Sequence, residues 1–357
     1  MDRHALEPVA GTTIADVTHR VLTLRGWPFD LADLTVSVRL TQPARGALEH
    51  ALETGDVVRS YALRGGSCVF TPEDAAVVLS TRTATRIWET DRWQRQGNFE
   101  LDDWQPLRDA VREALAAGPM TREEIGAHLA RIPGLRHLVA GAAGAGADSL
   151  YKPLHWWGDI CFGRPRDGES TFRLLCDDPR WPGLPDVDTA GPRALALYLG
   201  AYGPATLGNL RYFFTEGLGV PARRLSSWLA DLGDDVTAVL VDGVRSYART
   251  ADLDRLGAAE PSEAVRLVPA FDPWIMGPGT ADARVLSPAR RALASRGANL
   301  VLSGGVTCGI WRVHRRSVTL SWFEECGSAP VSALGDEVQR LAEIRGQELA
   351  LEIVHLT

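Results

Sequence analysis

Two carboxylates near the start of the chain, Asp30 and Asp33, are of a type and spacing that could support acid–base chemistry. An ionised carboxylate within reach of a water molecule can position that water or take its proton. Both residues follow Trp27-Pro28 closely. The competing interpretation is an exposed turn, in which Asp33 caps a helix or ends a loop. The sequence leaves both interpretations open.

Two further groupings combine polar and aromatic side chains. His155-Trp156-Trp157-Gly158-Asp159 could stack against a planar base. A helix that packs its tryptophans into a core is the favoured interpretation of the same segment. Asp272 lies within an apolar Phe-Asp-Pro-Trp sequence, where a buried carboxylate needs partners. A turn held by Asx hydrogen bonding and a role toward substrate are both open for Asp272.

The composition is that of a globular protein of two or three domains. Hydrophobic residues make up 45% and charged residues 23% of the 357 residues. No apolar run of about 18 residues is present, and residues 1–11 hold two acids and no apolar stretch. We therefore expect no membrane-spanning helix and no signal peptide. The expected location is the bacterial cytoplasm, in association with the nucleoid.

The cysteine content and the net charge limit the kinds of site and partner that can be expected. The five cysteines form no C-x-x-C pair, and their number is odd, so we expect reduced thiols and no disulfide framework. No metal and no cofactor is predicted. The net charge of −7 argues against a surface that binds polyanions everywhere. Nearly all positive charge is arginine, which suits phosphate and guanine contacts, although a GC-rich genome is the favoured explanation of that bias.

The order of elements in residues 192–248 indicates a DNA-binding unit. Leu207, Leu210 and Phe214 share one face of a predicted helix, and Leu225, Trp228, Leu229 and Leu232 share one face of the next. Val236–Val241 and Val244–Ala248 form a predicted hairpin around Asp242-Gly243. Three helices followed by a hairpin predict a winged helix, whose third helix normally enters the DNA major groove.

The same order recurs earlier in the chain. Gly118-Pro119-Met120-Thr121 resembles Gly203-Pro204-Ala205-Thr206, and Thr121 with Glu124 predicts a capping box. A weaker N-terminal copy has a predicted helix carrying Ile14, Val17, Val21 and Leu24 and another over Pro43–Thr54. Residues 140–147 are predicted as a loop and residues 177–191 as a linker.

The C-terminal part changes character. Val265–Val268, Leu300–Leu302, Val306–Val313 and Val318–Phe323 are predicted strands, and Val331–Arg345 is a predicted closing helix. The expected fold class is α+β, with tandem winged helices followed by a small β-barrel or sheet domain. The predicted boundaries are 1–95 for winged helix 1, 96–180 for winged helix 2, 190–258 for winged helix 3, and 262–357 for the C-terminal β domain.

Four segments carry a resemblance to a known family. They are Val58–Gly66 with its Arg-Gly-Gly hairpin, the helices from Gly203 to Leu232, Leu267–Gly277 with its Pro-Ala-Phe-Asp-Pro core, and Gly304–Arg312 with its Gly-Ile-Trp-Arg end. In this order they resemble the AlkZ/YcaQ family of bacterial DNA glycosylases. The resemblance implies binding of duplex DNA, extrusion of a modified nucleotide and hydrolysis of its N-glycosidic bond. Bulky alkylated purines and interstrand cross-links are the substrates it implies.

The chain departs from the family's catalytic pattern. The family's Gln-Φ-Gln or Gln-Φ-Asp motif aligns best with Thr23-Leu24-Arg25, which offers no general base. Cys68 stands where the family has a hairpin histidine, and Gln94-Arg95-Gln96 lies in a different element. Asp30 or Asp33 could replace the carboxylate. A non-catalytic damage sensor or transcription regulator, or a scaffold for protein interactions, is the alternative.

Phosphate contacts are expected from arginines on the predicted helices and hairpins, with isolated surface arginine as the alternative. The candidates are Arg64, Arg211, Arg223, Arg224, Arg245, Arg249, Arg312, Arg315 and Arg316. The expected partner is double-stranded DNA that carries damage. The protein is expected to be a monomer and not to bind membranes.

Overall fold

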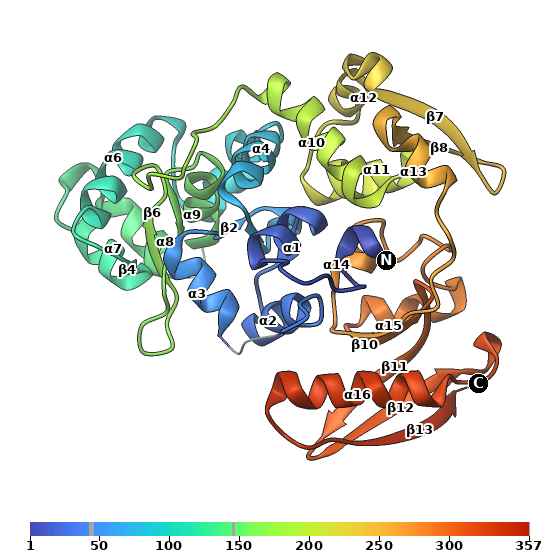
Figure 1. Ribbon diagram of the computed structural model, residues 1–357. Helices are drawn as coiled ribbons and strands as arrows, with labels where there is room; N and C mark the ends of the chain where they lie inside the picture. Colours follow the sequence, from blue (N-terminus) through green and yellow to red (C-terminus); the bar gives the residue numbers. More distant parts are fainter. Residues whose placement is uncertain (43–45, 145–146, 357) are drawn as a thin grey trace. The chain divides into compact units, whose positions relative to one another are not determined.

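Helices and strands alternate along the computed structural model, which describes residues 1–42, 46–144 and 147–356 (Figure 1). The predicted α+β class is confirmed. Two units are distinguished by their internal contacts. The first unit consists of Met1–Ala51, Ala196–Phe213 and Gly233–Thr357, and the second of Leu52–Leu195 and Phe214–Leu232. The backbone passes between them four times. The four predicted domain boundaries stay a prediction.

The second unit combines helices with two small groups of strands. Strands β2 (Val58–Tyr61) and β3 (Ser67–Phe70) pair antiparallel, and β4 (Met120–Thr121), β6 (Thr171–Leu174) and β5 (Ile160–Phe162) form a sheet in that order. Its helices are α4 (Pro72–Thr83), α5 (Asp91–Gly97), α6 (Trp104–Leu115), α7 (Arg122–Leu129), α8 (Val139–Ala143), α9 (Ala147–Trp156) and α12 (Ala222–Asp231). The predicted capping box at Thr121 and Glu124 is confirmed.

Tryptophans fill the core of the second unit. The rings of Trp88 and Trp157 meet edge to face at 5.2 Å, and those of Trp104 and Trp157 at 4.9 Å. Trp156 is fully buried. Such edge-to-face pairs add stabilisation beyond simple burial of the rings. The favoured interpretation of the His155–Asp159 segment, a helix end packed into a core, is therefore confirmed.

Three local predictions were wrong. The first predicted helix does not include Leu24, because α1 (Ile14–Val21) is followed by the C-cap residue Leu22, which has a φ of 60°, and Leu24 lies in β1 (Leu24–Arg25). Residues 139–143 are helical rather than looped, as alanine favours a helix even beside glycine. The expected linker ends early, because an Asp186 carboxylate oxygen accepts from the Asp188 N–H at 2.8 Å, at the start of α10 (Val187–Tyr202).

Some predicted segments overlap residues that lie outside the described ranges. In the helix predicted over Pro43–Thr54, residues 43–45 lie outside the described residues, and α3 begins at Ala47 and ends at Thr54. Residues 145 and 146 of the predicted loop also lie outside them. Helices α3 and α10 and a π-helical segment (Arg211–Gly217) continue through positions at which the backbone changes unit.

The first unit contains the N-terminal segment, the segment Ala196–Phe213, which begins within α10, and the C-terminal segment. Strands β7 (Val236–Val241) and β8 (Val244–Arg249) form the predicted hairpin, and its turn residues Asp242 and Gly243 have φ values of 50° and 77°. Positive φ at both central positions is what a two-residue hairpin turn needs. The further helices are a 3₁₀ turn (Asp2–His4), α2 (Phe29–Ser37), α11 (Leu207–Leu210), α13 (Leu253–Gly257), α14 (Pro273–Met276), α15 (Arg291–Ser295) and α16 (Val331–Arg345).

A five-stranded sheet forms the C-terminal part of the first unit. The strands follow the order β13 (Ala350–Leu356), β12 (Ser317–Phe323), β11 (Val306–His314), β10 (Asn299–Ser303) and β9 (Val265–Val268). Four strands and the closing helix are as predicted, whereas β13 was missed. It pairs in parallel with β12, and the other neighbours pair antiparallel.

Both faces of this sheet are covered. Leu334, Val338 and Leu341 of α16 pack on one face, beside Val301. Leu300 and Leu302 point to the opposite face and pack with Leu6, Ile275 and Leu286. Since neighbouring side chains of a strand alternate between faces, one strand contributes to both cores. The N-terminal segment is thereby fixed against the sheet.

Candidate functional site

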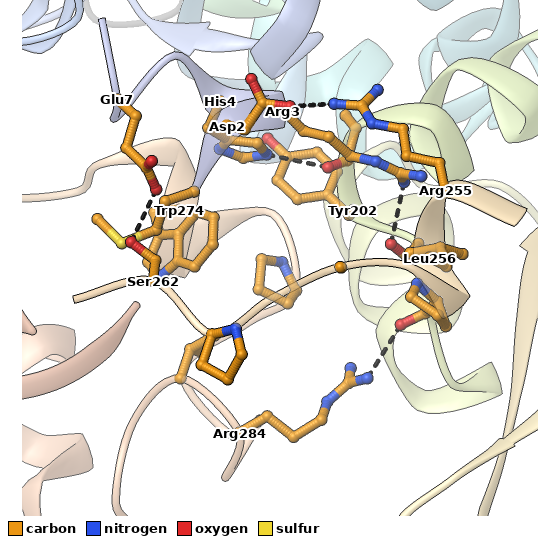
Figure 2. Close-up of a pocket in the computed structure, with 18 of the residues that line it drawn as sticks. Asp2, Arg3, His4, Glu7, Tyr202, Arg255, Leu256, Ser262, Trp274 and Arg284 are labelled. Atoms are coloured by element: carbon orange, nitrogen blue, oxygen red, sulfur yellow. Dashed lines mark hydrogen bonds and ion pairs between the residues drawn. The ribbon is translucent and has the colours of Figure 1, made fainter. Parts of the chain in front are cut away.

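The first unit contains a cavity of about 700 Å³, shown in Figure 2. Its lining comes from the N-terminal 3₁₀ turn, the end of α10, the segment from Arg255 to Ser262 and the segment from Trp274 to Val285. Ligand cavities typically measure about 300–1,000 Å³. Segments from the start, middle and end of the sequence therefore build one site of ligand size.

His4 is the most deeply buried polar residue of this cavity lining. Its Nε2 lies 3.1 Å from the Ala201 carbonyl oxygen, and its side chain packs edge to face against Tyr202 and Trp274. Burial, aided by the positive charge of Arg39, lowers the pKa of His4 to about 3. The ring is therefore neutral at pH 7. In the described part of the chain its Nδ1 is buried and meets no hydrogen-bond partner.

The two aromatic walls are held by hydrogen bonds. The Tyr202 hydroxyl donates to the Val21 carbonyl oxygen at 2.6 Å, and the Trp274 Nε1–H donates to the Gly305 carbonyl oxygen at 2.8 Å. The ring centroid of His4 lies 4.9 Å from that of Tyr202 and 5.1 Å from that of Trp274. The bonds fix the orientation of both rings before any ligand enters.

Ion pairs and hydrogen bonds join polar residues of the cavity lining. Arg255 pairs with Asp2, and Arg3 donates to the Gly203 carbonyl oxygen at 3.1 Å (Figure 2). The Glu7 carboxylate accepts from the Ser262 hydroxyl at 2.7 Å. These pairs occupy much of the local hydrogen-bonding capacity of the arginines.

Asp282 joins the cavity wall to the start of α11. Its carboxylate pairs with Arg284 at 2.6 Å and accepts from the Asn209 amide at 3.0 Å. Burial alone would raise the pKa of Asp282, but hydrogen bonds from the side chain and backbone of Arg284 hold the pKa below its usual value. The carboxylate is therefore ionised at neutral pH. The same pair raises the pKa of Arg284.

The structure places Asp30 and Asp33 on helix α2, so the expected exposed turn was wrong. Pro28 occupies the N-cap position, and neither aspartate caps the helix. Asp30 is exposed and Asp33 is half-buried. Residues three apart lie on the same side of a helix, so both carboxylates belong to one face of α2. Their catalytic role stays a prediction.

Asp272 has a structural role. Its carboxylate accepts two hydrogen bonds from Arg39, at 2.9 and 2.7 Å, and one from the Trp274 N–H at 2.9 Å. The side chains of Asp272 and Arg39 are both 0% exposed. A buried ion pair of this geometry satisfies both charges and leaves none for a substrate. The Asx turn at Asp272 is confirmed.

His155 and Asp159 of the second unit are also committed to the fold. The Ser60 hydroxyl lies 3.0 Å from His155 Nδ1, and burial lowers the pKa of His155 well below its usual value. Asp159 accepts from Arg108 at 2.7 Å and pairs with Arg112. Residues this deep in a core cannot stack an incoming base.

Most predicted phosphate-binding arginines are exposed, and two are held by carboxylates. Arg224 lies 3.6 Å from Asp188, and Arg249 donates twice to Asp252, at 2.8 and 3.0 Å. The exposed candidates are Arg64, Arg211, Arg223, Arg245, Arg312, Arg315 and Arg316. The last three belong to one hairpin of β11 and β12.

His4, Tyr202 and Trp274 were not singled out from the sequence as site residues. They are separated by about 200 and 70 positions, and no local periodicity links them. Trp274 was within a segment that carried the family resemblance, which was the available signal. Among residues 1–42, 46–144 and 147–356, no group of three His, Cys, Asp or Glu side chains could hold a metal, and no helix is long and apolar enough to cross a membrane.

Comparison with known proteins defines the class. A family model described as DNA glycosylase AlkZ-like matches residues 20–344. The protein is thus a DNA glycosylase, a hydrolase that binds DNA. More particularly, the chain belongs to the AlkZ-like family.

Two similar proteins come from Streptomyces sahachiroi. An interstrand DNA cross-link repair glycosylase is 29% identical over 355 residues, which cover 97% of this chain and 94% of the relative. The solved structure of DNA glycosylase AlkZ matches with a TM-score of 0.93 and 28% identity, covering 99% of this chain and 97% of that chain. The similarity therefore includes both units and the whole order of elements.

Proposed function

We propose that this glycosylase removes bulky alkylated purines from duplex DNA and unhooks interstrand cross-links. The observation that carries the proposal is the similarity, over nearly the full length of both chains, to a glycosylase named for interstrand cross-link repair. The enzyme is proposed to act as a monomer in the bacterial cytoplasm, on DNA of the nucleoid.

DNA is proposed to be held by winged helices. On α12, Leu225 and Trp228 are buried whereas Arg223, Ser226 and Ser227 are exposed, which suits a helix with one face available to a groove. The β7–β8 hairpin that follows carries exposed Arg245. The β11–β12 hairpin supplies three more exposed arginines. Contacts between these side chains and phosphates would position the duplex without reading its sequence.

Cleavage requires a group that positions water against an oxocarbenium-like sugar. In Thr23-Leu24-Arg25, Thr23 is buried and Arg25 stacks over Phe271 at 4.0 Å. A hydroxyl and a guanidinium group are not general bases near neutral pH, so this segment offers none. Asp30 and Asp33 are the proposed replacements, because they lie on the helix that follows this strand and at least one is open to solvent. The ionised carboxylate would accept the proton of the attacking water.

The test is base release from duplexes that carry N7- or N3-alkylated purines, detected as abasic sites. Asp30→Asn or Asp33→Asn should abolish release while DNA binding persists. Asp91→Asn, an exposed aspartate at the start of α5, is the matched control and should release base at the normal rate. Salt-dependent binding without release by the unaltered protein would contradict the proposed substrates. No binding at low salt would contradict the proposed phosphate contacts as well, because such contacts dominate affinity there.

A further inference from the structure

A buried arginine of the second unit has no counterion. Arg59, on β2, is 6% exposed, and its guanidinium carbon lies 4.4 Å from the centre of the Phe162 ring, which also contacts Tyr61 at 4.9 Å. Within the described residues, Arg59 has no carboxylate partner and its nitrogens meet no acceptor. Its Nε is fully enclosed, whereas its two terminal nitrogens keep some exposed surface. The groups whose charge could act on it, Tyr61 and Cys161, are neutral at pH 7, because burial raises the pKa of both, that of Cys161 to about 11. A buried charge of this kind is costly to the fold, and a ring face offsets only part of that cost.

The neighbours of Arg59 carry surplus positive charge. The Arg122 guanidinium donates to the Tyr61 hydroxyl at 3.0 Å, and the Lys152 ammonium lies 5.2 Å from the centre of the Tyr61 ring. These two cations share one carboxylate, that of Asp148, at 2.9 Å each. Tyr61 and Arg59 point to the same side of β2, because side chains two apart in a strand share a face. Three cations and one carboxylate therefore belong to this region, and the remaining charge favours an anion.

We propose that Arg59 binds a phosphate group of the DNA backbone. A guanidinium presents its N–H groups in a rigid fork that matches two oxygens of a phosphate. Because Nε is enclosed, the fork that a ligand can reach is the one formed by the two terminal nitrogens. The Phe162 ring already holds the guanidinium, so binding costs less side-chain entropy than at an exposed arginine. The inference depends on DNA binding by this glycosylase and not on the lesion that it removes.

A second buried arginine of the same unit differs from Arg59 in its contacts. Arg82 is 7% exposed, and no carboxylate of the described chain pairs with it. One of its terminal nitrogens, however, donates to the Leu218 carbonyl oxygen at 2.7 Å, and its guanidinium lies 4.2 Å from the centre of the Trp156 ring. The fold therefore uses the guanidinium of Arg82 to join two segments. The guanidinium of Arg59 makes no such bond, which leaves its terminal nitrogens for a ligand.

Binding of an undamaged duplex at several salt concentrations tests the contact. Each phosphate contact contributes about 0.9 to the slope of log Kd against log salt concentration. Arg59→Met should lower that slope by about one and weaken binding about tenfold at low salt. Arg59→Lys keeps the charge but loses the fork, so the slope should persist while the affinity falls. Arg86→Met alters an arginine whose side chain is 71% exposed and paired with Glu89, and it should bind as the unaltered protein does. An unchanged slope in Arg59→Met would overturn the proposal, as would full affinity in Arg59→Lys.

Thermal melting separates a ligand site from a structural role, and the DNA backbone from free phosphate. Arg59→Met removes an unpaired buried charge, so without DNA it should melt at or above the temperature of the unaltered protein, and a clear fall would overturn the proposal. Inorganic phosphate, compared with chloride at equal ionic strength, should stabilise the unaltered protein and not Arg59→Met. If phosphate does so while the duplex salt slope is the same in both proteins, the site takes the free anion and the assignment to DNA is overturned. Alkylated duplexes play no part in these measurements, so their failure leaves the proposed substrates standing.

Discussion

Two segments of the molecule share a sequence pattern and differ in what surrounds them. Gly118-Pro119-Met120-Thr121 starts α7 in the second unit, and Gly203-Pro204-Ala205-Thr206 starts α11 in the first. In both, the threonine N–H donates to the side chain three residues later at 2.8 Å. Each segment also pairs with a strand, Thr121 with Thr171 and Ala205 with Tyr247. The local motif therefore specifies the helix start in the same way twice.

The two helix starts differ in the residue that lies three positions after the threonine. Glu124 is 46% exposed in its side chain and meets Arg166 at the surface. Asn209 is 6% exposed, and its amide donates to the Pro278 carbonyl oxygen at 2.8 Å and to Asp282 at 3.0 Å. An amide carries both donors and an acceptor, whereas a carboxylate only accepts. Asn209 can thus cap α11 and bind a distant segment at the same time. That segment, which contains Pro278 and Asp282, lines the cavity.

The largest expected effect is that of Asn209→Ala. The substitution removes one half of the capping box and leaves the part-buried Pro278 carbonyl oxygen without its amide donor, so the free energy of unfolding should fall by about 2–3 kcal/mol. Urea titration followed by tryptophan fluorescence measures it. Glu124→Ala serves as the control and should lose less, because solvent replaces its contacts. Equal losses of unfolding free energy in Asn209→Ala and Glu124→Ala would contradict the idea that the contacts of Asn209 with the cavity wall add stability.

Arg284→Ala should have the next largest effect. Arg284 donates to the Pro204 carbonyl oxygen at 2.9 Å and pairs with Asp282, which is 5% exposed in its side chain. Loss of these charge-assisted bonds should lower the free energy of unfolding by about 1–2 kcal/mol. Arg166→Ala removes an exposed pair and should leave the urea midpoint unchanged. A larger shift in Arg166→Ala than in Arg284→Ala would reverse the comparison.

The threonine caps should give equal effects. Thr206→Ala and Thr121→Ala each remove an acceptor for one N–H in the first helical turn, which typically costs about 1 kcal/mol. Thermal melting of the two variants side by side gives the difference. Shifts that differ strongly would mean that the shared motif is not equivalent at the two sites. Exchange to serine, which keeps the hydroxyl, should restore most of the loss in both.

The smallest effect concerns pH. The pKa of Asp282 is lowered in the folded protein, so its ionised form contributes stability fully above the usual aspartate pKa of 3.8. That contribution is lost as the pH falls through the lower folded value. Asp282→Asn should therefore differ most from the unaltered protein at neutral pH, and the difference should shrink below about pH 4. Urea midpoints measured from pH 7 to pH 3 test the sign, and a difference that grows with acidity would contradict it.

Local chemistry explains which parts of the fold were predictable from sequence. The capping box at Thr121 and the Asp242-Gly243 hairpin depend on neighbouring residues, so the sequence was enough for both. Strand β13 was missed although Leu351 and Ile353 alternate with exposed neighbours; it lies at the edge of the sheet and pairs only with β12 among the described strands. One of the two open interpretations placed Asp30 and Asp33 in an exposed turn after Trp27-Pro28, whereas Pro28 occupies the N-cap position of α2.

The site was harder to predict than the fold. Arg39 and Asp272 are separated by 233 positions, and their pairing fixes Asp272 beside Trp274. The placement of His4 depends on its contact with Ala201, which no pattern near the N-terminus indicates. The family resemblance identified the segment of Trp274 without assigning the residue a role. Long-range pairing of buried polar groups is the information that a single sequence lacks.

The path of the backbone through the two units has a consequence for synthesis on the ribosome. Met1–Ala51 emerges first, yet its partners in the first unit include segments that are translated after residue 232. His4 must therefore remain without its Trp274 neighbour until most of the chain has been made. A premature stop codon between residues 157 and 273 yields a product that contains the α4 to α9 sequence and lacks Trp274, one wall of the cavity. In stalled nascent chains, protection of the N-terminal segment from proteolysis should appear only in the last steps of translation.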